Sequence, residues 1–190
     1  MKNICIVCLL FISHTVFAQS GIYMSWQDYQ AGKLSNVLNC DSKPVKIKLH
    51  HFFSSTCIYI QQGEQEVRFC KDSIFGYRDC AQNTFRFYKT NDDEYRIVEN
   101  QNIVIYTSDI PVTDIPGKTI KLIPGWFFSA SISSDILPLT INNLKRAFPN
   151  NLKFHDFLDV EFNSSQNISE YDTIHKMYKV NYLFNKSKNL

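Results

Sequence analysis

The number and spacing of the cysteines limit the chemistry that these residues can perform. The chain has six cysteines, and two of them, Cys5 and Cys8, lie in an apolar N-terminal segment. The other four follow that segment: Cys40, Cys57, Cys70 and Cys80. No C-x-x-C pair remains among these four, so the spacing typical of zinc sites is absent from this part of the sequence. An even number of cysteines in an exported chain permits disulfides.

The segment around Gly63 predicts which cysteines pair. If Gly63-Glu64 is a two-residue type II′ turn, Gln62 faces Gln65 across a hairpin. The apolar residues then meet on one face, as Ile60 with Val67 and Ile58 with Phe69. The opposite face carries the pairs Gln61–Glu66, Tyr59–Arg68 and Cys57–Cys70. Because this pairing places the apolar residues of both strands on the same face, the pattern predicts this register.

In this register Cys57 and Cys70 form a non-hydrogen-bonded pair, in which Cα atoms lie about 4.5 Å apart. That distance is at the short end of the range for disulfides. We therefore predict a Cys57–Cys70 bridge, which leaves Cys40 and Cys80 as the second pair. The alternative is that one or more of these cysteines remain as buried or reactive thiols.

Other kinds of reactive site have weaker support. A Cys–His enzyme needs a base beside a thiolate, and His50 and His51 could approach Cys57 across neighbouring strands, but no cysteine-hydrolase signature flanks them. A metal site could use His155, Asp156, Asp159 and His175. No H-E-x-x-H or comparable motif fixes their geometry, which favours the solvated side of amphipathic helices. The sequence also singles out no carboxylate pair for a glycosidase. We predict no catalytic residue, no metal and no cofactor.

The densest group of charged residues is "KDSIFGYRDC", residues 71–80. We interpret it as a turn at Lys71-Asp72, a strand from Ile74 to Arg78, and a second turn, because turns are where charged residues gather. Gly76 is then a bulge or a point of close packing within the strand. The predicted binding residues come from this strand and from the Gly63 hairpin: Tyr59, Arg68, Tyr77 and Arg78.

The aromatic content allows two interpretations. The chain has 15 Phe, 10 Tyr and 2 Trp. These rings can build a core and a helix–sheet interface, which is the simpler interpretation. They can also line a pocket or groove of a curled sheet that binds an apolar ligand or a glycan.

The elements that must position these residues follow from the hydrophobic period. Residues 21–139 contain period-two segments separated by polar turns, which predicts short antiparallel strands. The segments are "KPVKIKLHHFF", "STCIYIQQ", "QEVRFC", "SIFGYR", "NTFRFYK", "EYRIVE" and "NIVIYTS", followed by a hairpin of residues 126–132 and 136–139. Their short connections favour an antiparallel meander sheet, or a partly open barrel, of about seven to nine strands.

Residues 140–186 change to a helical period, so we predict an α+β fold with about three short C-terminal helices. The predicted helical segments are "LTINNLKRAFPNN", "NLKFHDFLDVEF" and "SEYDTIHKMYKVNYLF". Ser169 is the expected N-cap of the third, whose apolar stripe comprises Tyr171, Ile174, Tyr178 and Tyr182.

The N-terminus has the pattern of a signal peptide. Lys2 precedes an apolar run from Ile4 to Ile12, and cleavage after Ala18 would leave Gln19 as the first residue. The run is shorter than the roughly 20 residues of a membrane span. We expect residues 19–190 to form a single domain without a membrane span. The formal net charge is only +2 and no basic block is present, which argues against nucleic acid as a partner.

Four segments carry a resemblance: "SGIYMSWQDYQAGKL", "KDSIFGYRDC", "FRFYKTNDDEYRIVE" and "LTINNLKRAFPNNLKFHDFLD". Together they resemble small exported proteins of Bacteroidota, a group without an assigned activity. The resemblance implies export to the periplasm or the exterior and a single domain, and it transfers no functional residue. We therefore expect a non-enzymatic envelope module that binds a protein, a glycan or an apolar ligand. The alternative is an envelope hydrolase that uses a cysteine, histidine or carboxylate site.

Overall fold

The computed structural model describes residues 19–40, 46–49, 56–62, 65–88, 93–114, 119–162 and 167–188. The predicted signal peptide, His50 and His51, and the Gly63-Glu64 turn lie outside these residues. Within the described ranges, no helix has the length and apolar composition that crossing a membrane requires.

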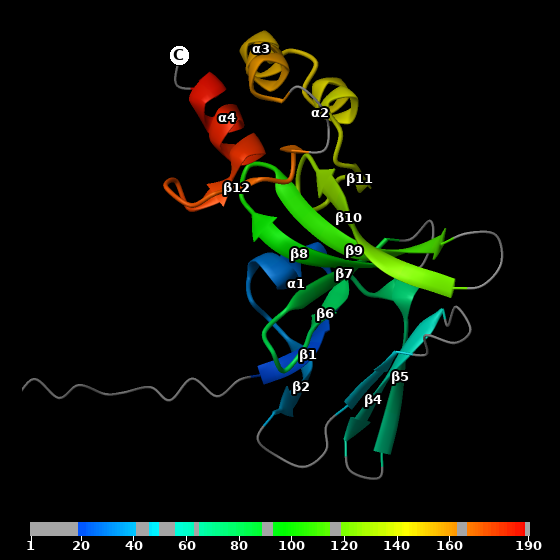
Figure 1. Cartoon of the computed structure of the whole chain (residues 1–190). Coiled ribbons are helices and arrows are strands. Elements are labelled where there is room, and N and C mark those ends of the chain that lie inside the picture. Colours follow the sequence, from blue (N-terminus) through cyan, green and yellow to red (C-terminus); the bar gives the residue numbers. More distant parts are fainter. Residues whose placement is uncertain are drawn as a thin grey trace, which may run out of the picture.

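The larger sheet contains eight antiparallel strands in the order β11-β10-β9-β8-β7-β6-β1-β2 (Figure 1). The strands are β1 (Gln19–Tyr23), β2 (Ser35–Asn39), β6 (Gly76–Arg78), β7 (Thr84–Phe87), β8 (Glu94–Asn100), β9 (Val104–Asp114), β10 (Thr119–Ser129) and β11 (Leu137–Pro138). From β6 to β11 each strand pairs with its neighbour in sequence, which confirms the predicted meander for this part. The sheet ends at β2 and β11 and does not close into a barrel.

A separate three-stranded sheet contains β3 (Lys46–Leu49), β4 (Cys57–Gln62) and β5 (Gln65–Cys70). The meander therefore does not run continuously from β3 to β11, because β1 instead of β5 pairs with β6. The predicted register of the β4–β5 hairpin is confirmed for all six pairs, including Cys57 opposite Cys70. The predicted Cys57–Cys70 disulfide is not formed in this structure, where both residues are thiols with Sγ atoms 3.2 Å apart. Ile58 and Ile60 pack against Ile22 and Phe87, which joins the small sheet to the large one through an apolar core.

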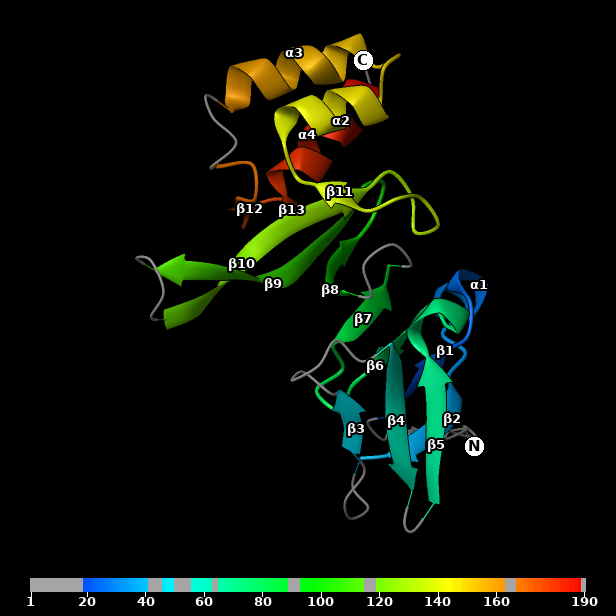
Figure 2. The ribbon, with the colours of Figure 1, turned by 90° about the vertical axis from the view of Figure 1, so that its right-hand side faces the viewer.

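The C-terminal part contains helices α2 (Ile141–Ala147), α3 (Leu152–Glu161) and α4 (Lys179–Lys188). Thr140 caps α2 and Asn151 caps α3, since each side chain accepts a hydrogen bond from a backbone N–H of the first turn. These helices gather over one end of the large sheet, opposite the end that carries β4 and β5 (Figure 2). Their apolar residues enclose the largest core cluster together with Ile103, Ile105 and Phe128.

The predicted start of the third helix at Ser169 is wrong. Residues 171–178 form a hairpin of β12 (Tyr171–Asp172) and β13 (Met177–Tyr178), and α4 begins at Lys179. The Asp172 carboxylate accepts hydrogen bonds from the backbone N–H groups of Ile174 and His175, both at 2.9 Å, which stabilises a turn. Lys176 has a positive φ of 54°, which a helix cannot accommodate.

One helix was not expected from the sequence. Helix α1 (Trp26–Gln30) follows β1 directly, and Ser25 caps it by accepting a hydrogen bond from Asp28 N at 3.1 Å. The helix holds Tyr29 against Phe75, with ring centroids 5.3 Å apart. This contact places the last turn of α1 beside the segment that leads into β6.

Cys40 and Cys80 form a disulfide, as predicted, with Cα atoms 5.6 Å apart. The bond joins the residue after β2 to the turn between β6 and β7. It therefore fixes the edge of the large sheet, where β2 pairs with β1 and β1 pairs with β6 from a more distant part of the chain.

Candidate functional site

A cavity of about 440 Å³ lies where three distant segments of the chain meet. The segments are residues 24–26 at the start of α1, residues 72–75 in and after the short 3-10 helix η1 (Lys71–Ser73), and residues 132–135 before β11. Strand β7 and the residue after it supply the fourth wall through Arg86, Phe87 and Tyr88. Its volume is within the range of small-molecule sites.

The walls combine rings with hydroxyl groups and acids. The lining rings are Trp26, Phe75, Phe87 and Tyr88, and the other apolar residues are Met24, Ile74 and Ile132. The lining hydroxyl and carboxylate residues are Ser25, Ser73, Ser133, Asp72 and Asp135. A cavity with aromatic walls and a few polar groups is typical of sites that bind small organic molecules.

Arg86 is the lining residue with the most unusual environment. It is only 7% exposed, and the rings of Phe75, Tyr88 and Tyr106 lie 5.6, 6.0 and 5.9 Å from its guanidinium carbon. Among the residues that the structure describes, no carboxylate lies within ion-pair distance of this guanidinium. Burial of a charged group costs free energy unless an opposite charge or hydrogen bonds compensate it. A bound anion would therefore stabilise the buried guanidinium of Arg86.

A directed chain of hydrogen bonds holds Arg86 in place. Nη1 donates to Tyr106 Oη and Nη2 donates to the Ser134 carbonyl, both at 2.9 Å. Tyr106 Oη lies 2.8 Å from Ser129 Oγ, which itself donates to the Ser131 carbonyl at 2.6 Å. Burial raises the pKa of Tyr106, so its hydroxyl remains a donor to Ser129. These contacts use two of the five N–H donors of the guanidinium.

Tyr88 and Asp135 also line the cavity. Burial, together with a hydrogen bond to Asp135, raises the pKa of the Tyr88 hydroxyl. The Tyr88 ring also faces the Tyr95 ring edge-on, with centroids 6.4 Å apart. The phenol is thus a protonated group hydrogen-bonded to Asp135, and its ring lies 6.0 Å from the guanidinium carbon of Arg86.

None of the residues predicted for binding lines this cavity. Tyr59 and Arg68 are brought together as a cross-strand pair of β4 and β5. Tyr77 is 3% exposed, stacks on Phe85, and donates a hydrogen bond from its hydroxyl to Glu94 at 3.0 Å. Arg78 lies over the Tyr23 ring at 5.4 Å. Tyr77 therefore has a packing role, and binding by these four residues stays a prediction.

The histidines and acids considered for a metal site are dispersed. His155 Nε2 lies 3.0 Å from the Phe148 carbonyl, and Asp159 accepts a hydrogen bond from Lys145 at 2.6 Å. Asp156 is exposed on α3. No group of three or more metal-ligating side chains is found in the described part of the chain.

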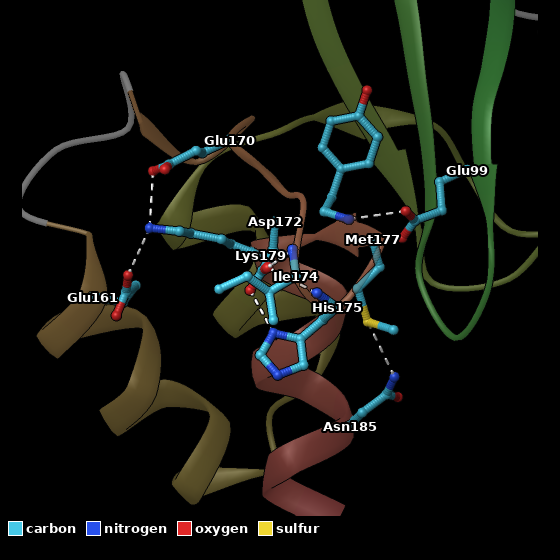
Figure 3. Close-up of polar contacts among 10 residues, drawn as sticks. Glu99, Glu161, Glu170, Asp172, Ile174, His175, Met177, Lys179 and Asn185 are labelled. Atoms are coloured by element: carbon cyan, nitrogen blue, oxygen red, sulfur yellow. Dashed lines mark hydrogen bonds and ion pairs between the residues drawn. The ribbon is translucent and has the colours of Figure 1, made fainter.

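Figure 3 shows His175 with Asp172 in the β12–β13 hairpin. His175 Nδ1 lies 2.7 Å from Asp172 Oδ2, and the imidazole stacks on Tyr182 with ring centroids 4.0 Å apart. Hydrogen bonds from the backbone N–H and the side chain of His175 lower the pKa of Asp172. Because the same carboxylate fixes the turn, this pair is explained by the local structure of the hairpin.

Arg86 is not among the residues predicted from the sequence. The available signal was the pattern "TFRFY" from Thr84 to Tyr88, in which an arginine shares a strand face with Tyr88 between two phenylalanines. Pairing of β7 with β8 places Arg86 opposite the buried Tyr95. Arginine side chains are mostly exposed in proteins, so a buried arginine opposite a core tyrosine is unusual.

Comparison with known proteins adds no assignment to this geometry. No protein-family model matches the chain, and no curated protein and no solved structure is significantly similar to it. The interpretation of the Arg86 cavity therefore rests on its own residues.

Proposed function

We propose that this protein is an exported, non-enzymatic binding module whose Arg86 cavity takes a small organic anion with an apolar or aromatic body. The observation that supports this most directly is a guanidinium that is 7% exposed and lines a cavity of about 440 Å³. Its unused N–H donors match the oxygen atoms of a carboxylate, sulfate or phosphate group. The adjacent rings offer an apolar surface to the rest of the ligand.

The hydrolase alternative has less support. The described lining of the cavity contains no histidine and no cysteine, so the usual base and thiol nucleophile have no counterpart there. Asp72 and Asp135 belong to different segments, and Asp135 is engaged by Tyr88. A rigid arginine between aromatic walls is a means of orienting a ligand, and it does not itself supply a nucleophile or a base.

Export is part of the same proposal. The apolar N-terminal sequence supports secretion, and the Cys40–Cys80 disulfide fits an oxidising compartment such as the periplasm. The described part of β1 begins at Gln19, the residue that cleavage after Ala18 would leave first.

The test is a comparison of ligand binding by the wild type, Arg86→Gln and Arg96→Gln. Arg96 is an exposed arginine of β8 and does not line the cavity, so it is a matched control. Calorimetric titration would use a panel of aromatic and aliphatic carboxylates, uronic acids, and organic sulfates and phosphates. We expect at least one class to bind the wild type and Arg96→Gln equally. Loss of a charge-assisted hydrogen bond should weaken binding to Arg86→Gln by about 10- to 100-fold.

A second variant tests the cavity without replacing the buried Arg86, so the proposal stays testable if Arg86→Gln does not fold. Trp26 lines the cavity and is 37% exposed, so Trp26→Ala should fold and still lose ligand affinity. Circular dichroism would verify that each variant is folded. Equal affinity of folded Arg86→Gln and wild type would contradict the proposal, and so would a failure of every anion in the panel to bind.

A further inference from the structure

The β4–β5 hairpin brings two thiols with different environments face to face. Cys57 Sγ and Cys70 Sγ lie 3.2 Å apart on adjacent strands. Cys57 is only 2% exposed, whereas Cys70 is exposed at the end of β5. An outside reagent can therefore reach one sulfur of the pair and not the other.

The surroundings of Cys57 favour its thiolate. Burial on its own raises the pKa of Cys57, but hydrogen bonds from Cys70, Arg68 and Thr56 outweigh this effect and lower the pKa below its usual value. Arg68 belongs to β5, two residues before Cys70, and its guanidinium is hydrogen-bonded to Cys57. The hydrogen bond with Cys57 raises the pKa of Cys70. The buried sulfur is thus the better leaving group, and the exposed sulfur is the one open to attack.

We propose that Cys57 and Cys70 form a thiol–disulfide exchange site that reacts with dithiol redox proteins, with Cys70 as the point of attack. In the reducing direction, a thiolate of the reductant attacks Cys70 Sγ of the Cys57–Cys70 disulfide. The bond between the two cysteines breaks, and Cys57 leaves with the electron pair as a thiolate beside Arg68.

The second step restores the reductant in oxidised form. Its second thiolate attacks its own sulfur in the mixed disulfide with Cys70, which releases Cys70 as a thiolate. The reductant becomes a disulfide, and two electrons and the two protons of its thiols pass to Cys57 and Cys70. Oxidation follows the same steps in reverse, with a disulfide partner as the electron acceptor.

The Cys40–Cys80 bond provides an internal reference. It closes a sequence separation of 40 residues, whereas Cys57 and Cys70 are separated by 13 within a single hairpin. A disulfide that closes a longer loop removes more entropy from the unfolded chain. Cys40–Cys80 is accordingly the structural bond in this scheme, and Cys57–Cys70 is the exchangeable one.

The experiment measures both pairs in one sample. The oxidised full chain is equilibrated with glutathione buffers of increasing reduced fraction, quenched by alkylation, and mapped by mass spectrometry. We expect Cys57–Cys70 to open at a reduced-to-oxidised ratio about tenfold or more below that of Cys40–Cys80. Opening of both pairs at the same ratio, or no Cys57–Cys70 bond under full oxidation, would overturn the proposal.

Two sets of variants test the direction of attack. In Cys57→Ser the glutathione adduct should form readily at Cys70, whereas in Cys70→Ser an adduct at the buried Cys57 should form several-fold more slowly. Arg68→Gln should slow opening of Cys57–Cys70 several-fold and leave Cys40–Cys80 unchanged, because a stabilised leaving thiolate speeds exchange. The exposed Arg96→Gln should match the wild type. Faster labelling of Cys57 than of Cys70 would reverse the assigned roles and refute the mechanism.

Discussion

At the scale of single residues, burial separates arginines that look equivalent in sequence. Arg86 is buried in an aromatic environment, while Arg68 and Arg96 are exposed on β5 and β8. Because these two side chains lie at the surface, we expect their replacement to change the free energy of unfolding little. In place of water, the Arg86 guanidinium contacts two hydrogen-bond acceptors and three aromatic rings. It is thus the arginine with the strongest physical reason to bind an anion.

Gly76 shows how a single missing side chain allows two strands to pack. A Cβ atom at this position would lie 1.9 Å from the Phe85 carbonyl oxygen on β7. We expect Gly76→Ala to lower the free energy of unfolding by about 3 kcal/mol, since backbone has to shift to relieve the overlap. Urea denaturation followed by circular dichroism measures this loss.

Gly32 serves as the control for the Gly76 substitution. It has a positive φ of 65°, but an added Cβ would meet no atom within 4 Å. Gly32→Ala should therefore cost only about 1 kcal/mol, the cost of left-handed backbone. Equal losses for the two variants would show that close packing at Gly76 is not the reason for glycine there.

At the scale of elements, α4 is attached to the sheet by a buried polar side chain. Asn181 is fully buried, accepts a hydrogen bond from Ile103 N at 2.9 Å, and donates one to the Ile103 carbonyl at 2.8 Å. It also donates to Glu99, whose pKa burial raises. These contacts join a helix at the C-terminus to the turn between β8 and β9.

Replacement of Asn181 by alanine should destabilise the protein strongly. We expect Asn181→Ala to lower the free energy of unfolding by about 3 kcal/mol, because the backbone groups of Ile103 would stay buried without partners. Asn185→Ala on the same helix is the matched control, since Asn185 is only partly buried and its contact with Asn102 is at the surface. A loss below about 1 kcal/mol for Asn181→Ala would contradict the role of this contact.

At the scale of the whole molecule, the Arg86 cavity exists only because distant segments converge. Residues 24–26, 72–75, 86–88 and 132–135 all line it. Figures 1 and 2 show that β1 and α1 lie beside β6 and β7, although the β3–β5 sheet separates them in sequence. The Cys40–Cys80 bond holds this arrangement at the sheet edge. Ligand binding and overall stability are therefore expected to depend on the same assembly.

The contribution of that disulfide can be measured directly. Cys40→Ser/Cys80→Ser should lose about 4 kcal/mol of unfolding free energy, the amount expected for a loop that spans 40 residues. Guanidinium denaturation without reductant compares this variant with the wild type. Cys57→Ser/Cys70→Ser is the control, compared with wild type in which Cys57 and Cys70 have been oxidised to a disulfide, and it should lose less, about 3 kcal/mol, because its loop is shorter. A larger loss for the control pair would contradict the assignment of Cys40–Cys80 as the structural bond.

Local patterns predicted much of the architecture. The alternation on either side of Gly63 gave the pairing of Cys57 with Cys70, and the period of residues 140–162 gave α2 and α3. These predictions succeeded because side-chain period and turn type act over a few residues. The same reasoning failed at Ser169, where Asp172 stabilises a turn that competes with the helix.

The sequence alone determined the α+β class and the register of the β4–β5 hairpin, since each follows from contacts between near neighbours. It also predicted the Cys40–Cys80 disulfide, whereas the predicted Cys57–Cys70 bond is absent from the structure. The tertiary structure alone decided that β1 pairs with β6, that β3–β5 form a separate sheet, and that Arg86 becomes a buried cation in a cavity. The physical reason is that an edge strand offers the same backbone groups to any partner, so long-range packing selects among them. Whether Arg86 is buried depends on which strands pair, and the local alternation of apolar and polar residues does not show this.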